Sequence, residues 1–195
     1  VFDDNGKPVR GKVGELVCKK PWPGMTRGIW GDPDRFIEVY WSRWKNIWWH
    51  GDFASIDKDG YWFLHGRSDD TIKVAGKRVG PAEIEGVVNS HPAVVESAAV
   101  GVPDELKGEA VVVFVVLKDK HTPSDALRQE IIDHVSRALG KPMAPKAVKF
   151  VRMLPKTRNA KILRRVVRAK YLGQQNLGDL SNLENAEAIE EVARA

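Results

Sequence analysis

The sequence lacks most of the patterns that would place it in a specialised class of protein. It contains one cysteine among 195 residues, so an internal disulfide is excluded. No apolar run is long enough to span a membrane and no signal-peptide pattern is seen, from which we expect a cytoplasmic protein without a membrane partner. There is no phosphate loop of the G-x-x-x-x-G-K-S/T type. The five histidines show no metal-ligand spacing, which argues against a structural zinc site.

Positive charge is concentrated in one stretch late in the sequence. Residues 156–170 hold seven Lys or Arg and no acidic residue. Apolar positions in the same stretch share one helical face, which predicts a helix over residues 159–172 with Lys161 near its start. Lysine is a compact cation on a flexible stem and suits a phosphate or carboxylate oxygen. A helix that binds nucleic acid, or one that is merely solvated, would look the same, and the net charge of +5 does not separate these alternatives.

The distribution of tryptophan divides the chain into two parts. All seven tryptophans precede residue 63. In this first part, an acid-rich turn at 57–60 between aromatic runs indicates a β-hairpin, with strands at 47–54 and 61–66. Residues 36–46 are expected to form a short helix or an extended edge. The composition changes after Asp69.

The second part predicts helices and strands in the order β-β-α-β-β-α-β-α, which is typical of a small α+β domain. Pro81 opens one helix, and Thr122 is the expected cap of another that ends at Gly140. The apolar run 110–117 predicts a strand buried on both faces. The other expected strands cover residues 71–75, 77–79, 94–102 and 147–151. We expect an α+β domain over 69–173, with a short sheet flanked by helices, and a polar tail over 174–195 with a short helix near 184–192.

Four segments in order carry a family resemblance: residues 48–52, 66–70, 73–85 and 155–165. Together they resemble the acyl-adenylate-forming superfamily, and segments 22–24, 30–36 and 177–183 are similar to its AMP-forming acetyl-CoA synthetases. A complete member is several times longer and has an upstream phosphate loop. The resemblance therefore implies the C-terminal part of a larger enzyme, in which residues 1–68 end a large N-terminal adenylation domain and the α+β domain that follows is mobile.

The resemblance implies an acetate-CoA ligase that uses ATP, CoA and Mg²⁺. Acetate would be activated to acetyl-AMP, and the acetyl group would then pass to CoA. Two alternatives stay open: a synthetase for propionate or another short-chain acid, and, for the isolated fragment, a nucleotide- or CoA-binding module without activity. The missing N-terminal part of the same enzyme is an expected partner, as are a lysine acetyltransferase and deacetylase that act on Lys161. Nucleic acid is not.

The resemblance also assigns roles to residues around the nucleotide. Lys161 is the catalytic cation of the adenylation step. Asp52 would hold the ribose hydroxyls, since a carboxylate accepts two hydrogen bonds from a vicinal diol. An ordinary aspartate in a turn is the alternative. Arg67 would contact the ribose or phosphates, or else pair on the surface with Asp69 or Asp70. Asp69 matches the position about which the family's two domains pivot.

Other residues are assigned to CoA and to the metal. Gly76 and Arg78 would bind CoA, although an ordinary hairpin turn explains them too, and Arg137 is a weaker match for the CoA phosphates. His91 would help to bind Mg²⁺ or would only cap a helix. Related proteins have Ser-Gly before the catalytic lysine, where this chain has Asn-Ala, so either the loop is conventional or Asn159 adopts the unusual backbone angles.

Overall fold

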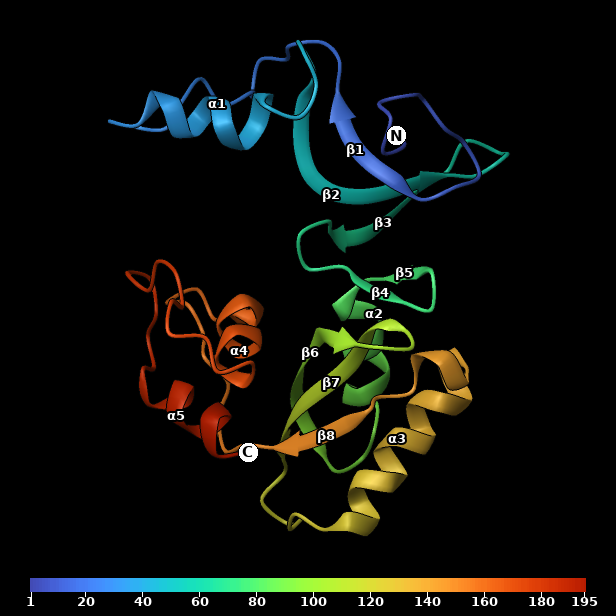
Figure 1. Cartoon of the computed structure of the whole chain (residues 1–195), viewed down its shortest axis with the longest axis vertical. Helices are drawn as coiled ribbons and strands as arrows, with labels where there is room; N and C mark the ends of the chain where they lie inside the picture. The colour runs from blue at the N-terminus through green and yellow to red at the C-terminus, as the bar shows by residue number, and fades with distance from the viewer. The chain divides into compact units, whose positions relative to one another are not determined.

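A computed structural model describes residues 1–195 as two compact units, Val1–Asp69 and Asp70–Ala195 (Figure 1). No helix in the chain combines the length and the apolar character that a membrane span requires.

The first unit is built on a three-stranded antiparallel sheet of order β1-β2-β3. The predicted hairpin is confirmed as the β2–β3 pair, but β2 runs two residues beyond the expected end. The helix expected within 36–46 begins earlier, because Asp32 caps it by accepting a hydrogen bond from Arg35 N–H and a proline occupies its first turn. The elements are β1 (Gly14–Cys18), α1 (Pro33–Trp41), β2 (Trp48–Ile56) and β3 (Trp62–Arg67).

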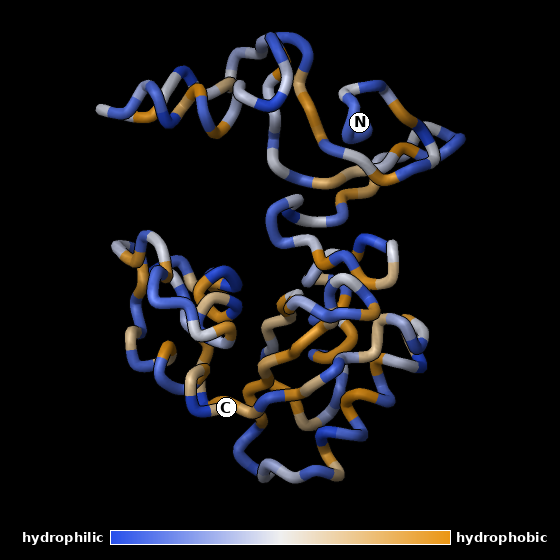
Figure 2. Tube along the Cα trace, in the orientation of Figure 1, coloured by the Kyte–Doolittle hydropathy of each residue, from blue (hydrophilic) through white to orange (hydrophobic).

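The second unit contains a five-stranded sheet. Its main path is β5-β4-β7-β6, and β8 pairs with β7 in parallel. The strand predicted to be buried on both faces is confirmed as β7, where residues 110–115 are all buried; Figure 2 shows this run as hydrophobic. The strands are β4 (Ile72–Val74), β5 (Lys77–Val79), β6 (Val94–Asp104), β7 (Gly108–Leu117) and β8 (Ala147–Phe150).

Two apolar cores lie on opposite faces of this sheet because alternate residues of β7 point in opposite directions. Val111, Val113 and Val115 pack with apolar residues of α2 and α3, whereas Ala110, Val112 and Phe114 pack with residues of α4 and α5. The expected sheet flanked by helices is therefore confirmed. The helices are α2 (Pro81–Asn89), α3 (Asp125–Leu139), α4 (Arg164–Tyr171), α5 (Glu187–Arg194) and a 3₁₀ turn, η1 (Lys141–Met143).

Two predicted helix starts are wrong. Helix α3 is capped by Ser124, whose side chain accepts a hydrogen bond from Leu127 N–H at 3.2 Å, and not by Thr122. Helix α4 begins at Arg164 and not at residue 159, because residues 156–162 form a separate turn. In the tail, α5 covers residues 187–194 and buries Ala188, Ile189 and Val192.

Candidate functional site

Three of the predicted residues in the first unit lie together at the β2–β3 pair. Asp52 and Arg67 are directly opposite each other in the antiparallel register. The Arg67 guanidinium donates from Nε and Nη2 to the two carboxylate oxygens of Asp69, at 3.0 and 3.2 Å, and from Nη1 to the carbonyl of His50 at 3.3 Å. The surface pairing of Arg67 with Asp69, one of the two expected alternatives, is thus present.

Gly51 makes room for this arrangement. Its φ of +82° is a conformation that favours glycine, and an added Cβ would lie 2.8 Å from Arg67 Nη2. The neighbouring Asp52 carboxylate is 21% exposed and touches the ring of His50 through Nδ1. His50 carries no motif of its own, but it stands two residues before Asp52 on the same strand, where side chains i and i+2 share a face. The group combines two carboxylates, one guanidinium and one imidazole.

In the second unit, Gly76 lies in the tight turn between β4 and β5. Both loop residues have positive φ, 48° at Ala75 and 77° at Gly76, which is the geometry of a two-residue hairpin turn. An added Cβ at Gly76 would meet nothing within 4 Å, so the backbone of this turn is open to a ligand. Arg78, on the returning strand, pairs across the hairpin with Lys73 and is exposed.

Lys161 lies in a turn that backbone hydrogen bonds close on both sides. Lys156 and Ile162 form an antiparallel bridge. Thr157 N–H donates to the Lys161 carbonyl at 2.9 Å, and Lys161 N–H donates to Thr157 Oγ1 at 3.2 Å. The Lys161 side chain is exposed and makes no ion pair, so this hydrogen-bonded turn presents an ammonium group to solvent.

The residue with unusual angles in this turn is Ala160, with φ at 58°. Both expected alternatives, a conventional loop and unusual angles at Asn159, are therefore wrong. The tail lies beside the same turn: Arg158 N–H donates to the Asn182 carbonyl at 3.1 Å, and Glu184 N–H donates to the Lys156 carbonyl at 2.9 Å.

His91 is buried, with 5% of its surface exposed, and both ring nitrogens have partners. Nδ1 accepts the N–H of Ala93 at 3.3 Å, so Nε2 carries the proton that faces Glu130 Oε1 at 3.2 Å. No group of three or more His, Cys, Asp or Glu in residues 1–195 is arranged to hold a metal. A role of His91 in magnesium binding stays a prediction, although Mg²⁺ prefers oxygen donors to imidazole nitrogen.

Arg137 lies in the last turn of α3 and is exposed. No hydrogen bond or ion pair joins any two of Lys161, His91 and Arg137. The structure therefore brings together the predicted residues of the first unit, but leaves these three on separate elements of the second.

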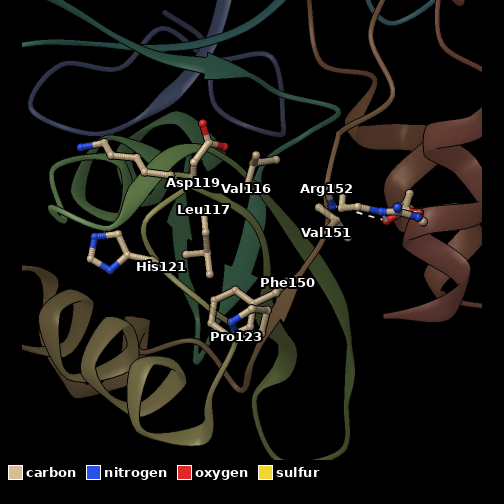
Figure 3. A pocket seen from close by; sticks show the side chains of 10 residues that line it. Val116, Leu117, Asp119, His121, Pro123, Phe150, Val151 and Arg152 are labelled. Carbon is tan, nitrogen blue, oxygen red and sulfur yellow. Dashed lines mark hydrogen bonds and ion pairs between the residues drawn. The ribbon is translucent and has the colours of Figure 1, made fainter.

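A cavity of about 370 Å³ opens elsewhere in the second unit (Figure 3). Its wall combines apolar residues from the ends of β7 and β8 with an ion pair between Arg152 and Glu191. The hydrogen bond from Arg152 lowers the pKa of the Glu191 carboxyl, so this pair stays charged at neutral pH. None of the predicted site residues lines the cavity.

Comparisons with known proteins identify the chain's relatives. Residues 83–161 match the family described as AMP-binding enzyme C-terminal domain. The whole chain is 52% identical to acetyl-coenzyme A synthetase of Pyrobaculum aerophilum and covers 29% of its length. It is also 46% identical to 3-hydroxypropionyl-coenzyme A synthetase of Sulfurisphaera tokodaii, with all of the chain and 30% of the relative covered.

A solved structure shares the fold. Acetoacetyl-CoA synthetase from Streptomyces lividans superposes with a TM-score of 0.88 over 99% of the chain and 29% of that protein, at 28% sequence identity. The chain thus spans less than a third of the length of each of these relatives.

Proposed function

We propose that the chain is the C-terminal part of an acetate-CoA ligase, because residues 83–161 match the AMP-binding enzyme C-terminal domain and the whole chain aligns with 29% of an acetyl-CoA synthetase. The complete enzyme converts acetate and ATP into acetyl-AMP and pyrophosphate. The thiol of CoA then attacks acetyl-AMP and releases AMP with acetyl-CoA. Another short-chain acid is the alternative substrate, since one relative is named for 3-hydroxypropionate.

The observation that carries this proposal is the exposed Lys161 on its closed turn. In the first half-reaction, a carboxylate oxygen attacks the α-phosphorus of ATP, and negative charge accumulates on the oxygens around it. An ammonium group aimed at these oxygens stabilises the transition state more than the ground state. Loss of one such donor typically costs roughly 3–4 kcal/mol, a hundred- to thousand-fold in rate.

The residues of the first unit would hold the nucleotide. Asp52 would accept hydrogen bonds from the two ribose hydroxyls, and Arg67, opposite it in the sheet, would offer its guanidinium to ribose or phosphate oxygens. Arg67 donates Nε and Nη2 to Asp69, so in this role the guanidinium would turn part of its donor set from Asp69 to the nucleotide.

The second half-reaction would use another face of the second unit. We assign Asp69 as the pivot, and the division of the chain between residues 69 and 70 supports that assignment. The open turn at Gly76 and the exposed Arg78 would then meet CoA, with Arg137 as a further contact for its phosphates. Withdrawal of Lys161 and presentation of this turn would let one domain serve both steps.

Four further assignments complete the proposal. Magnesium would accompany ATP. Acetylation of Lys161 by a protein acetyltransferase would remove its charge and stop adenylation until a deacetylase restored it. We place the enzyme in the cytoplasm and expect the 195-residue chain alone to be a nucleotide- or CoA-binding module without activity.

The test compares two variants of the full-length enzyme. Lys161→Ala should lower acetate-dependent ATP–pyrophosphate exchange by about a hundred- to thousand-fold, yet spare formation of acetyl-CoA from supplied acetyl-AMP. Lys120→Ala is the matched control, because Lys120 is also an exposed lysine of the second unit. Equal loss of both half-reactions in Lys161→Ala would refute the assigned role.

A further inference from the structure

Glu85 is a buried acidic residue in a position that sequence patterns leave unexplained. It lies on α2 with 6% of its surface exposed. Its Oε1 accepts hydrogen bonds from Arg164 Nε at 2.7 Å and from Ala99 N–H at 2.9 Å, and its Oε2 accepts from Arg164 Nη2 at 2.6 Å. A glutamate is rarely buried without a charged partner, and here a two-point ion pair supplies it.

The partner, Arg164, stands where a helix does not favour positive charge. It is the first residue of α4, whose first turn has two arginines, no acidic residue and no side-chain cap. The amino end of a helix carries partial positive charge, which repels a cation there. The Glu85 carboxylate offsets this repulsion. It also holds the guanidinium in place, and its hydrogen bond raises the pKa of Arg164.

The chain between Lys161 and Arg164 is short and held at each step. Ile162 bridges to Lys156, and Leu163 N–H donates to the Pro155 carbonyl at 2.9 Å. No unrestrained residue lies between Arg164 and Lys161, so a displacement of Arg164 would also displace Lys161.

A second carboxylate near Arg164 is more distant. Asp70 Oδ2 lies 3.8 Å from Arg164 Nη1, against 2.6 Å for the closest contact of Glu85. Asp70 is also 29% exposed, whereas the Glu85 side chain is 8% exposed, so water screens Asp70 more. Glu85 is the dominant anchor.

We propose that Glu85 is a positioning residue for adenylation, which acts by holding Arg164 and thereby fixing the turn that carries Lys161. This inference rests on the proposed role of Lys161. Its consequence is selective, since a displaced ammonium group impairs the step that needs the cation at phosphorus and spares the thioester step. A displacement of about 1 Å can cost roughly a hundred-fold in rate.

The first experiment uses Glu85→Gln in the full-length enzyme. Glutamine keeps the size of the side chain but removes its charge. We expect pyrophosphate exchange to fall by roughly ten- to a hundred-fold, with the KM for ATP changed less than kcat, while acetyl-CoA formation from acetyl-AMP stays within about twofold. The matched control is Glu190→Gln, which breaks the ion pair that Glu190 forms with Lys170, near the other end of α4. It should leave both half-reactions unchanged.

A double variant separates positioning from general support of the fold. If Glu85 acts through Lys161, then Glu85→Gln should cost nothing further in exchange when Lys161 is already alanine. An equal additional loss in the Lys161→Ala background would overturn the inference. So would a parallel fall in both half-reactions of Glu85→Gln.

Arg164→Lys tests the same pair if Glu85→Gln does not fold. It keeps a cation beside Glu85 but loses the two-point contact. It should show the same selective loss of exchange, and full exchange activity would overturn the inference. Normal exchange in Lys161→Ala alone would instead refute the proposed function, and the inference would fall with it. A defective Lys161→Ala with a normal Glu85→Gln would refute the inference alone.

Discussion

Replacement of Ala160 by glycine should stabilise the second unit, although glycine usually weakens a folded chain. Ala160 precedes Lys161 and has a φ of 58°, in the left-handed region. An L-residue with a Cβ pays about 1–2 kcal/mol to adopt this conformation, and glycine does not. Glycine also has more freedom in the unfolded chain, which costs about 0.4–1 kcal/mol. The difference is a net gain of up to about 1.5 kcal/mol.

The assay can separate the two units because their chromophores differ. All seven tryptophans lie in the first unit. Thermal unfolding of the 195-residue chain by far-ultraviolet circular dichroism reports both units, while tryptophan fluorescence reports the first. In a chain of this size, 1 kcal/mol shifts Tm by roughly 2–4 °C. Ala160→Gly should raise the Tm of the second unit by up to about 6 °C and leave the fluorescence transition unchanged.

A matched control reverses the sign. Ala144 lies in the same unit with an ordinary φ of −57°, so Ala144→Gly should destabilise the unit by about 0.4–1 kcal/mol. If Ala160→Gly lowers the stability as much as Ala144→Gly does, the strain at position 160 does not exist and the reasoning is refuted.

Three other substitutions test separate features of the fold. Asp104→Asn should lower Tm at neutral pH, because the hydrogen bond from Lys146 lowers the pKa of the Asp104 carboxyl. The stabilisation from this carboxylate is present above the ordinary aspartate pKa and is lost as the pH falls through the lowered pKa. The difference in Tm between the variant and the unchanged chain should therefore vanish in acid. Gly86→Ala should stabilise α2 by about 0.5–1 kcal/mol, seen as a higher Tm, because the added Cβ enters open space; a lower Tm would contradict this. Gly14→Ala should destabilise the first unit, because the Cβ would lie 2.3 Å from the Phe2 carbonyl oxygen; an unchanged fluorescence transition would exclude the clash.

Local patterns predicted most of the sheet of the second unit. The apolar run of β7 and the proline at the start of α2 are local signals, and each was sufficient to predict its element. The same logic misplaced the start of α4, because Ile162 continues the apolar period of the helix although it belongs to the bridge with Lys156. Periodicity reports which side chains are apolar and does not report whether the backbone has already turned.

Contacts between distant residues could not be predicted in this way. Glu85 and Arg164 are separated by 79 positions, and neither shows a local signal of its partner. In the first unit, the pairing of Arg67 with Asp69 was anticipated as an alternative because only two positions separate them. Whether a charge is buried depends on packing, which one sequence alone does not reveal.

The tail that lies beside the Lys161 turn has a practical consequence for the handling of this protein. Within residues 182–185, Asn182 and Asn185 accept hydrogen bonds from the backbone of the turn, and Glu184 donates one to it. Residues 174–180 are mostly exposed. A protease that cut this exposed stretch would break the covalent link between α4 and the strip that braces the turn, and the strip would then be held only by its hydrogen bonds and by the buried residues of α5. A shortened domain designed to end at Tyr171 would lack both this strip and α5, so it would leave the Lys161 turn without its brace and part of the second apolar core uncovered.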